Sequence, residues 1–543
     1  MTAANPAPPS PSPSPSLRVV VADKMAPGGL ELLARTPGIE VVNCAGKPRE
    51  ELERALERAH ALIVRSETRV TADLMNRAPQ LKVIARAGIG VDTIDVHAAT
   101  RRGIAVMNAP GANTVSAAEH AMGLLLSLVR HLPWAAESMR RGEWDRKRYE
   151  GTELRGKTLG IVGLGRIGGH VAGIARAFGM TVIGHDPYLS PERTAELQVK
   201  TMPLEQMLAA ADVVTLHLAL TDQTRHLINA ERLAAMKPTA IIVNTARGEL
   251  IDEVALAAAI TAKKIAGAAL DVFTEEPLSA DSPLRKLDRV ILTPHLAAST
   301  AEAQDRVSHE ISTTVRDALL DGDLSTAVNV SGVGAEALRR ATPLLDLARR
   351  LGRLALALAD LPVSAVELAY GGKDESVARP ALLAALEGLL TGIGEIGVSL
   401  VNAPLIAEEH GIRLTRRTGA AEPGFETSLE VVVEAAGGRK RVVGALVAGT
   451  QGRVIKIDDY GVDLTPDGWV LVIRNRDVPG VIGRVGTLLG EAGVNVASWN
   501  QARRGSGGEA LAAIAVDQSI ANGVRMKLEQ LPDLLEVRVV HFG

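Results

Sequence analysis

The sequence predicts an α/β protein with two parallel-sheet lobes, followed by an α+β segment and a C-terminal ferredoxin-like domain. Short β-branched runs alternate with helical stretches from residue 17 to about residue 299. This alternation is typical of parallel strands joined by crossover helices. From Trp469 onward the elements follow the order strand, helix, strand, strand, helix, strand, which indicates a ferredoxin-like βαββαβ domain.

Two sets of strands define the predicted lobes. The first lobe contains five runs, LRVVVAD, IEVVNC, ALIVRS, LKVIARAG and GIAVMN, and the second contains six, TLGIVG, MTVIGHD, DVVTLHL, AIIVNTA, IAGAALD and RVILTPH. A helix from Ser116 to about Arg130 should bridge the lobes, and a helix from about residue 301 to residue 320 should return to the first lobe.

The returning helix makes the first lobe discontinuous. The predicted domains are a Pro/Ser-rich disordered tail (1–16), a first-lobe domain (17–115 and 301–330), a second-lobe domain (116–300), an α+β segment (331–466) and the C-terminal domain (467–543).

A glycine-rich loop, TLGIVGLGRIG, opens the second lobe. Gly163, Gly165 and Gly168 allow a tight turn, close backbone approach and packing of helix on strand. The amide groups at the start of that helix would face a pyrophosphate. Asp186 ends the next strand, where a carboxylate contacts the adenosine ribose and favours NAD over NADP. The lobes are therefore predicted to be Rossmann-like, and the second to bind NAD. The predicted cofactor contacts also include Arg166, Ile167, Thr245 and Asp271.

Three polar residues are each expected at the carboxyl end of a strand of the second sheet, where ligands of open α/β sheets bind. His295 is a suitable base near neutral pH for removing a hydroxyl proton. Glu276 could hold the imidazole, and the planar fork of Arg247 could bind a carboxylate. Each alone is explained as well by a structural salt bridge or a capped strand end. Their placement on one sheet favours a catalytic set.

The composition limits the classes of partner. The chain has 543 residues, 46% of them apolar, and a formal net charge of −3, so no basic surface for nucleic acid or an anionic membrane is indicated. No apolar run reaches about 18 residues, which excludes a membrane-spanning helix. No His/Cys/Asp/Glu cluster has metal-ligand spacing. His217 and His226 are interpreted as core or loop residues, and the basic segment 139–151 as a solvated helix end and loop.

Cysteine usage and the N-terminal segment indicate the compartment. A single cysteine, Cys44, excludes an intrachain disulfide and fits a reducing environment. Residues 1–16 lack the basic and apolar regions of a signal peptide. We therefore expect a cytoplasmic protein.

Ordered segments of residues 17–330 resemble the D-specific 2-hydroxyacid dehydrogenases, and within them the D-3-phosphoglycerate dehydrogenases. These segments are VRSETRVTADLM, RAGIGVDTIDVHAATRRGIAVMNAPGANTVSAAEH, GLGRIG, NTARGELIDE, AGAALDVFTEEP and TPHLAAST. The resemblance implies NAD-dependent oxidation of a phosphorylated D-2-hydroxy acid, 3-phospho-D-glycerate, in serine synthesis. It implies Arg247, Glu276 and His295 as the catalytic set, and it places Arg65, Ser66, Arg86 and Gly88 near the substrate phosphate and carboxylate. Ala297 stands where relatives usually carry glycine.

The remaining length resembles the long form of that family, with an intervening domain and a C-terminal ACT domain. The resemblance implies that L-serine binds between paired ACT domains of a homo-oligomer, a dimer or a tetramer. Asp477 would contact the ammonium group, Asn495 its polar end, and Asn475 is a further candidate. The alternative is that residues 477–480 form only a turn.

Two other functions remain open at this stage. A related D-2-hydroxyacid dehydrogenase acting on 2-hydroxyglutarate or glyoxylate shares the catalytic set but has no evident need for a C-terminal sensor. A non-catalytic NADH-responsive interaction protein would not need Arg247, Glu276 and His295 together.

Overall fold

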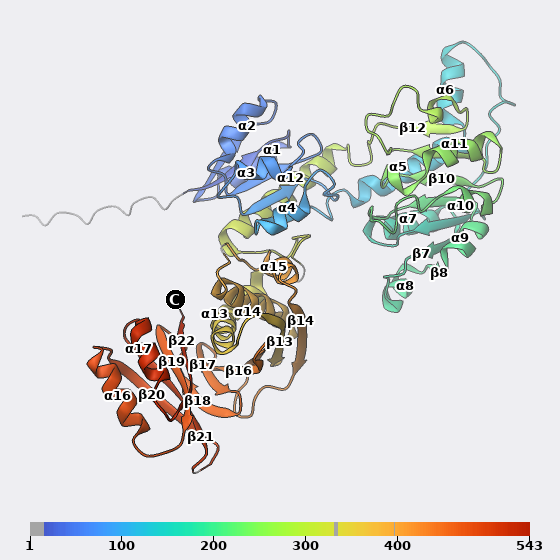
Figure 1. Ribbon diagram of the computed structural model, residues 1–543. Coiled ribbons are helices and arrows are strands. Elements are labelled where there is room, and N and C mark those ends of the chain that lie inside the picture. Colours follow the sequence, from blue (N-terminus) through green and yellow to red (C-terminus); the bar gives the residue numbers. More distant parts are fainter. Residues whose placement is uncertain (1–15, 331–334, 396, 506, 543) are drawn as a thin grey trace, which may run out of the picture.

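The computed structural model describes residues 16–330, 335–395, 397–505 and 507–542. These residues fold around four separate sheets of five, seven, six and four strands. Figure 1 shows how the sheets and their helices are arranged. The predicted fold class, with two parallel sheets followed by two smaller mixed or antiparallel ones, is confirmed. The predicted tail lies outside the described residues except for Ser16.

The first lobe contains the five predicted strands, all parallel, in the order β2-β1-β3-β4-β5. They are β1 (Leu17–Val21), β2 (Ile39–Asn43), β3 (Ala61–Val64), β4 (Val83–Arg86) and β5 (Ala105–Asn108). Every residue of β3 and β5 is buried. Because successive strand residues point to opposite faces of a sheet, both faces are covered there. The helices are α1 (Pro27–Ala34), α2 (Arg49–Leu56), α3 (Ala72–Asn76), α4 (Val96–Arg101) and α12 (Ala301–Asp321). As predicted, the helix after His295 returns to this lobe, where α12 packs against α1 and β4.

The second lobe has a seven-stranded parallel sheet in the order β12-β11-β10-β9-β6-β7-β8. Its strands are β6 (Thr158–Val162), β7 (Thr181–His185), β8 (Lys200–Thr201), β9 (Val213–Leu216), β10 (Ile241–Asn244), β11 (Gly267–Leu270) and β12 (Val290–Leu292). Six were predicted. The seventh, β8, is a two-residue exposed edge strand with no apolar run to reveal it. The strand order reverses beside β6, at the point where such sheets bind ligands.

Helices surround this second sheet and connect it to the first lobe. They are α5 (Thr114–Val129), α6 (Leu132–Arg140), α7 (Arg166–Ala177), α8 (Pro191–Leu197), α9 (Leu204–Ala210), α10 (Ala230–Ala235) and α11 (Glu253–Thr261), with short 3-10 turns η1 (Gly248–Leu250) and η2 (Pro283–Lys286). The predicted bridging helix corresponds to α5, which packs against α7 and strands β10 to β12.

The third unit is a six-stranded sheet covered by helices. Its strands, in the order β14-β13-β15-β16-β17-β18, are β13 (Val363–Gly371), β14 (Arg413–Gly419), β15 (Ser428–Ala435), β16 (Gly438–Val447), β17 (Gln451–Ile457) and β18 (Tyr460–Leu464). The helices are α13 (Ala335–Leu358), η3 (Glu375–Val377), α14 (Ala378–Gly392) and α15 (Ala403–Glu409). The strand-like runs TSLEVVVEA, KRVVGALVAG and GRVIKID of the sequence correspond to β15, β16 and β17. The strands β14 and β18 form the edges of the sheet, and β14 is largely polar and exposed, so neither carries a long apolar run.

The C-terminal unit follows the predicted βαββαβ order. It consists of β19 (Trp469–Arg476), α16 (Val481–Glu491), β20 (Val496–Arg503), β21 (Glu509–Val516), α17 (Asn522–Glu529) and β22 (Leu534–His541), with the antiparallel sheet order β20-β21-β19-β22. One sheet face packs beneath α16 and α17. The other face joins the core around α13, so the third and fourth units share one hydrophobic cluster.

Among the helices in the described part of the chain, none is both long and apolar enough to cross a membrane. The single cysteine, Cys44, is a buried free thiol.

Candidate active site

The glycine-rich loop joins β6 to α7 and leaves its backbone open to a ligand. Gly163 has φ 91°, and a Cβ there would lie 2.5 Å from the carbonyl oxygen of His217. A Cβ at Gly168 would lie 2.0 Å from the carbonyl oxygen of Gly163, so this glycine permits helix α7 to pack closely. A Cβ at Gly165 would meet nothing within 4 Å. The free space therefore lies at the loop position predicted to face a pyrophosphate. Arg166 and Ile167 form the first turn of α7, where amide groups have no intrahelical acceptor.

Two further predicted cofactor residues lie at the carboxyl edge of the same sheet. Asp186 follows β7, and its carboxylate accepts hydrogen bonds from the amides of Leu164 (2.9 Å) and Tyr188 (3.0 Å). It is thereby fixed beside the glycine-rich loop. Thr245 follows β10, and its buried hydroxyl has no hydrogen-bond partner among the described residues. A buried hydroxyl without a partner is costly, so a ligand that bonds it would relieve that cost. The open loop, the fixed Asp186 and this hydroxyl fit a bound dinucleotide.

The predicted base and its carboxylate are in direct contact. Glu276 lies in the segment after β11 and His295 in the turn after β12, and Nδ1 of His295 lies 2.8 Å from Oε2 of Glu276. An ionised carboxylate only accepts hydrogen bonds, so Nδ1 donates and Nε2 is left as the acceptor of the neutral ring. Both side chains are partly exposed, at 47% for His295 and 38% for Glu276. The reactive nitrogen is therefore accessible to a substrate.

Several groups act on the charge of Glu276. Burial raises the pKa of its carboxyl, but the hydrogen bond and charge of His295 and the amide of Phe273 outweigh burial and hold the pKa below its usual value. The amide of Phe273 donates to Oε1 at 3.1 Å. Glu276 is thus a carboxylate at neutral pH, able to stabilise an imidazolium as His295 gains a proton.

Asp271 fixes the turn that carries His295. Its side chain is fully buried, and Oδ1 accepts hydrogen bonds from the hydroxyl of Thr293 (2.6 Å) and the amide of Leu296 (2.8 Å). Oδ2 accepts one from the amide of Ala297 at 2.8 Å. His295 itself has φ 54°, in the left-handed region. Asp271 was predicted to contact the cofactor. Its carboxylate already has these protein donors, so the structure shows a role in positioning, and the cofactor contact stays a prediction.

A second histidine that the sequence analysis did not identify also bonds Asp271. His120, on α5, has its Nε2 3.1 Å from Oδ1 of Asp271. Ala297, which departs from the glycine usual in relatives, is buried, and its carbonyl oxygen accepts a hydrogen bond from Ser116 at 2.7 Å. The helix α5 thus supports the His295 turn from its other side.

Arg247 lies in the segment after β10 and reaches the first lobe. Its Nε donates to Oδ2 of Asp92 at 2.9 Å, and its Nη1 donates to the carbonyl oxygen of Ala246 at 2.6 Å. Because β10, β11 and β12 are adjacent parallel strands, the segments carrying Arg247, Glu276 and His295 leave the same edge of one sheet. The structure therefore supports the predicted convergence of the three residues, and Glu276 and His295 touch.

The predicted substrate-binding residues follow two neighbouring strands of the first lobe. Arg65 and Ser66 follow β3, and Arg86 ends β4. Nη1 of Arg65 donates to the carbonyl oxygen of Lys24 at 3.0 Å. A Cβ at Gly88 would lie 2.4 Å from Nη1 of Arg86, so the glycine leaves room for that guanidinium.

Arg86 lies within the electrostatic field of Arg247. Burial and, after it, the charge of Arg247 together lower the pKa of Arg86 to about 10, although Asp92 opposes the shift. Nε of Arg86 is buried without a hydrogen-bond partner in the described part of the chain. Arg86 remains cationic at neutral pH, with an unused donor. This environment suits an anionic ligand.

The two histidines interpreted as core or loop residues are placed as expected. Burial lowers the pKa of His217 to about 4, so it is neutral at physiological pH. His226 is exposed in a loop. Within the described ranges, no group of three or more His, Cys, Asp or Glu residues could hold a metal ion.

The candidate effector residues Asp477 and Asn495 lie at opposite ends of the C-terminal sheet. Asp477 follows β19, and its amide donates to the carbonyl oxygen of Gly508, whereas Asn495 precedes β20, and its carbonyl oxygen accepts from the amide of Asp517. One chain therefore does not bring these two residues together. Oδ2 of Asp477 lies 3.3 Å from Nη1 of Arg503, and Nδ2 of Asn495 lies 2.6 Å from Oδ2 of Asp517. Asn475 is buried, and its side chain donates to the carbonyl oxygen of Arg476. Asp477 and Asn495 remain the more accessible candidates.

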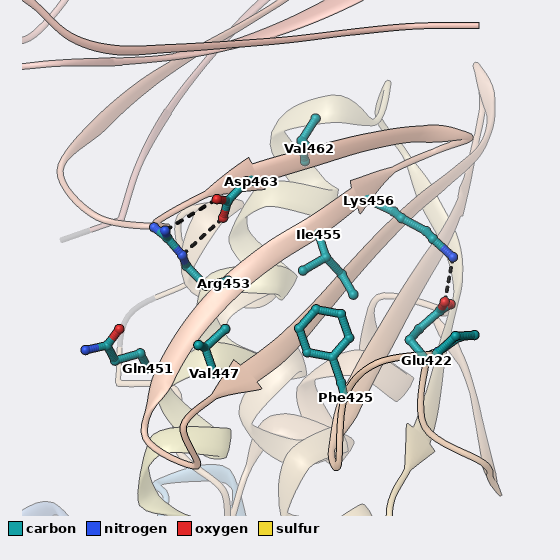
Figure 2. A pocket seen from close by; sticks show the side chains of 10 residues that line it. Glu422, Phe425, Val447, Gln451, Arg453, Ile455, Lys456, Val462 and Asp463 are labelled. Atoms are coloured by element: carbon teal, nitrogen blue, oxygen red, sulfur yellow. Dashed lines mark hydrogen bonds and ion pairs between the residues drawn. The ribbon is translucent and has the colours of Figure 1, made fainter.

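A cavity of about 570 Å³ lies on the third sheet, far along the chain from the glycine-rich loop. Figure 2 shows Phe425 and Ile455 within it, and the charged side chains paired with one another. Lys456 pairs with Glu422 at 2.5 Å, and Arg453 pairs with Asp463 at 3.1 Å. These charged side chains neutralise each other. The cavity therefore differs from the two lobes, where the hydroxyl of Thr245 and Nε of Arg86 are buried without a partner among the described residues.

Comparisons with known proteins agree with this division of the chain. Residues 122–297 match the NAD binding domain of D-isomer specific 2-hydroxyacid dehydrogenases, residues 340–458 the D-3-phosphoglycerate dehydrogenase intervening domain, and residues 469–533 the ACT domain.

Curated relatives match nearly the whole chain. A D-3-phosphoglycerate dehydrogenase of Mycobacterium tuberculosis is 42% identical over 525 residues, which is 96% of this chain and 98% of that protein. One of Methanocaldococcus jannaschii is 40% identical over 531 residues, covering 97% of this chain and 100% of that protein.

Solved structures match the two lobes. A glyoxylate reductase from Paecilomyes thermophila is similar with a TM-score of 0.53 and 33% identity, over 58% of this chain and 99% of that one. A D-lactate dehydrogenase from Aquifex aeolicus, complexed with NAD and lactic acid, is similar with a TM-score of 0.51 and 29% identity, over 57% of this chain and 97% of that one.

The open space at Gly165 leads to a prediction about cofactor binding. In a Gly165→Ala variant, the added methyl group would occupy the space predicted for the pyrophosphate, so we expect NADH affinity to fall about tenfold or more, equivalent to about 1.4 kcal/mol. Fluorescence titration with NADH measures this. Gly173→Ala is the matched control, because Gly173 also lies on α7 and its added Cβ meets nothing within 4 Å. Equal NADH affinity of both variants and the parent would contradict the placement.

Proposed function

The chain belongs to the D-3-phosphoglycerate dehydrogenase family, and we propose that it oxidises 3-phospho-D-glycerate to 3-phosphooxypyruvate with NAD, the first step of phosphorylated L-serine synthesis. The observation that carries this proposal is the contact between His295 and Glu276 at the sheet edge from which Arg247 also leaves, opposite two arginines of the first lobe.

His295 and Glu276 provide the proton chemistry of the proposed reaction. Nε2 of His295 takes the proton of the C2 hydroxyl as the C2–H bond breaks, and Glu276 stabilises the resulting imidazolium. NAD, held by the glycine-rich loop, Asp186 and Thr245, would supply the acceptor for the hydride of C2. The proton and the hydride therefore leave the substrate separately, and a carbonyl forms at C2.

The arginines bind the anionic groups of the substrate. The Arg247 guanidinium binds the C1 carboxylate and polarises the C2 oxygen, because its planar fork donates two parallel hydrogen bonds. Arg86, with Arg65 and Ser66 on the neighbouring strand end, binds the phosphate. A substrate with charge at both ends would thus be held between the lobes.

A further part of the proposal concerns assembly and regulation. We propose a homo-oligomer, a dimer or a tetramer, in which L-serine binds between paired C-terminal domains at Asp477 and Asn495. The match of residues 469–533 to the ACT domain supports an effector site.

The role of His295 is tested with a His295→Asn variant. Asparagine tolerates the left-handed backbone at this position but cannot act as a base near neutral pH, so turnover should fall by about 10²–10⁴-fold. NADH formation from 3-phosphoglycerate is followed by absorbance. His226→Asn is a matched control, because His226 also has φ near 50° and is exposed in a loop. Unchanged turnover of the His295→Asn variant would remove the base from the mechanism. Absence of NADH formation by the unaltered protein would contradict the substrate assignment.

The role of Arg86 distinguishes a phosphorylated substrate from other D-2-hydroxy acids. Arg86→Ala should raise KM for 3-phosphoglycerate by about tenfold or more, since a charge-assisted hydrogen bond contributes roughly 1.5–3 kcal/mol. KM for D-lactate, a D-2-hydroxy acid without a second anionic group, should change far less. Steady-state kinetics with both substrates provide the measurement, and Arg58→Ala, at an exposed position of the same lobe, is the control. An equal effect on both substrates would place the phosphate elsewhere.

Serine regulation is tested by titrating L-serine into the assay and into a calorimeter. An allosteric coupling of about 1–3 kcal/mol would appear as a roughly 5–150-fold change in apparent affinity. Asp477→Ala should weaken serine binding, because the ammonium group loses its carboxylate. Glu529→Ala, an exposed carboxylate at the end of α17, is the control. Neither binding nor inhibition by serine in the unaltered protein would dismiss this part of the proposal.

A further inference from the structure

The ion pair between Asp92 and Arg247 joins the two lobes at the site of the proposed reaction. Asp92 lies in the loop after β4 of the first lobe, and Arg247 in the segment after β10 of the second. Oδ2 of Asp92 lies 2.9 Å from Nε and also 2.9 Å from Nη2 of the guanidinium. The Asp92 side chain is 52% exposed and that of Arg247 is 25% exposed, so the pair lies at an accessible surface.

The contact uses one side of the guanidinium and leaves the other available. A guanidinium has five N–H donors in a fixed plane. Asp92 occupies the side formed by Nε and Nη2, and the carbonyl oxygen of Ala246 accepts from Nη1. Nη1 and Nη2 each keep one N–H group beyond these contacts, and a carboxylate can accept hydrogen bonds from both nitrogens. A substrate carboxylate therefore need not displace Asp92.

The backbone of the Asp92 loop is shaped around this guanidinium. A Cβ at Gly90 would lie 1.7 Å from Nη2 of Arg247 and 2.5 Å from Oδ2 of Asp92. Any larger residue at this position would push the guanidinium or the carboxylate away. The absence of a side chain at Gly90 is thus a condition for the ion pair.

Asp92 also offsets the repulsion between two arginines. Arg247 and Arg86 act on one another electrostatically, and the carboxylate of Asp92 acts on both. Burial raises the pKa of Asp92, but the charge and hydrogen bond of Arg247 outweigh it, so the net shift is downward. Asp92 is therefore ionised at neutral pH and stabilises the position of Arg247 beside Arg86.

We propose that Asp92 is a positioning residue: it holds the Arg247 guanidinium by its Nε side, across the two lobes, and so directs the other end of the fork toward the substrate carboxylate. This inference rests on the proposed function, because it assigns the free end of the fork to the C1 carboxylate. It adds Asp92, a residue of the first lobe, to the predicted catalytic set of Arg247, Glu276 and His295, which all lie on the second lobe.

The test is a double-mutant cycle that pairs Asp92→Ala with Arg247→Lys. Asp92→Ala should lower kcat/KM for 3-phosphoglycerate about tenfold or more, and Asp92→Asn, which keeps an acceptor oxygen, should lose less. In the Arg247→Lys background, where no fork remains to be oriented, removing Asp92 should change kcat/KM less than about twofold, because residues that act as a unit are non-additive. NADH affinity, measured by fluorescence, should be the same in all variants.

Controls separate this role from general damage. Asp73→Ala removes an exposed carboxylate of the same lobe and should leave kcat/KM unchanged. Circular dichroism and the NADH titration report whether each variant is folded. Losses that multiply independently in the double mutant would overturn the proposal. So would an Asp92→Ala variant with a lower KM, since Asp92 would then compete with the substrate carboxylate.

A structural measurement separates failure of this inference from failure of the proposed function. If the unaltered protein oxidises another D-2-hydroxy acid instead of 3-phosphoglycerate, the same cycle is run with that acid. A crystal structure of Asp92→Ala should show the Arg247 guanidinium displaced from Gly90. An unmoved guanidinium would overturn the positioning role whichever substrate is used.

Discussion

The geometry of His295, the proposed base, depends on one buried carboxylate, that of Asp271. A fully buried charge is tolerated only when hydrogen-bond donors surround it. Here the donors come from α5, through His120, and from the turn after β12, through Thr293 and the amides of Leu296 and Ala297. The same contacts that satisfy the carboxylate hold the His295 turn in its left-handed conformation. Glu276 then fixes the imidazole ring itself. The base is therefore positioned before any substrate arrives, which avoids reorganisation during the reaction.

The sequence predicted the parts of the fold and site that depend on local pattern. Strands buried on both faces, such as β6 and β10, appear as continuous apolar runs, and a polar residue directly after such a run lies at the ligand-binding edge. Arg247, Glu276 and His295 could be found in this way. The edge strands β8, β14 and β18 were missed because exposure removes the apolar signal. Asp92, Gly90 and His120 were missed because their roles depend on contacts between distant segments. For Gly90 and Asp92, the only local signal was that a glycine and a carboxylate lie close together after β4.

The packing of the C-terminal half connects the effector candidates to the substrate-binding lobe. The inner face of the C-terminal sheet, including Val470 and Val540, shares a hydrophobic cluster with α13 and α14. Leu383, on α14, belongs in turn to the core of the first lobe, and Arg101 of that lobe pairs with Glu409 of α15 at 2.5 Å. Packed interiors transmit displacement because they have few voids. Contiguous packing of this kind is the physical condition for a domain movement to reach Arg65 and Arg86, although coupling itself is established only by measurement.

The Arg247–Asp92 pair connects the two lobes, which have different parts in the proposed proton transfer and anion binding. In the proposed reaction the proton chemistry involves the second lobe alone, because His295, Glu276 and Asp271 all lie on it. Anion binding belongs to both lobes, since Arg247 is on one and Arg86 on the other. Two guanidiniums that face the same substrate repel each other while no anion is bound, and burial of Arg86 strengthens that repulsion. A carboxylate that bonds Arg247 from the side of Arg86 reduces the repulsion without using the end of the fork. The two lobes can then keep their relative position in the absence of substrate. The binding energy of the two anionic groups of the substrate is therefore available for orienting C2 toward the base.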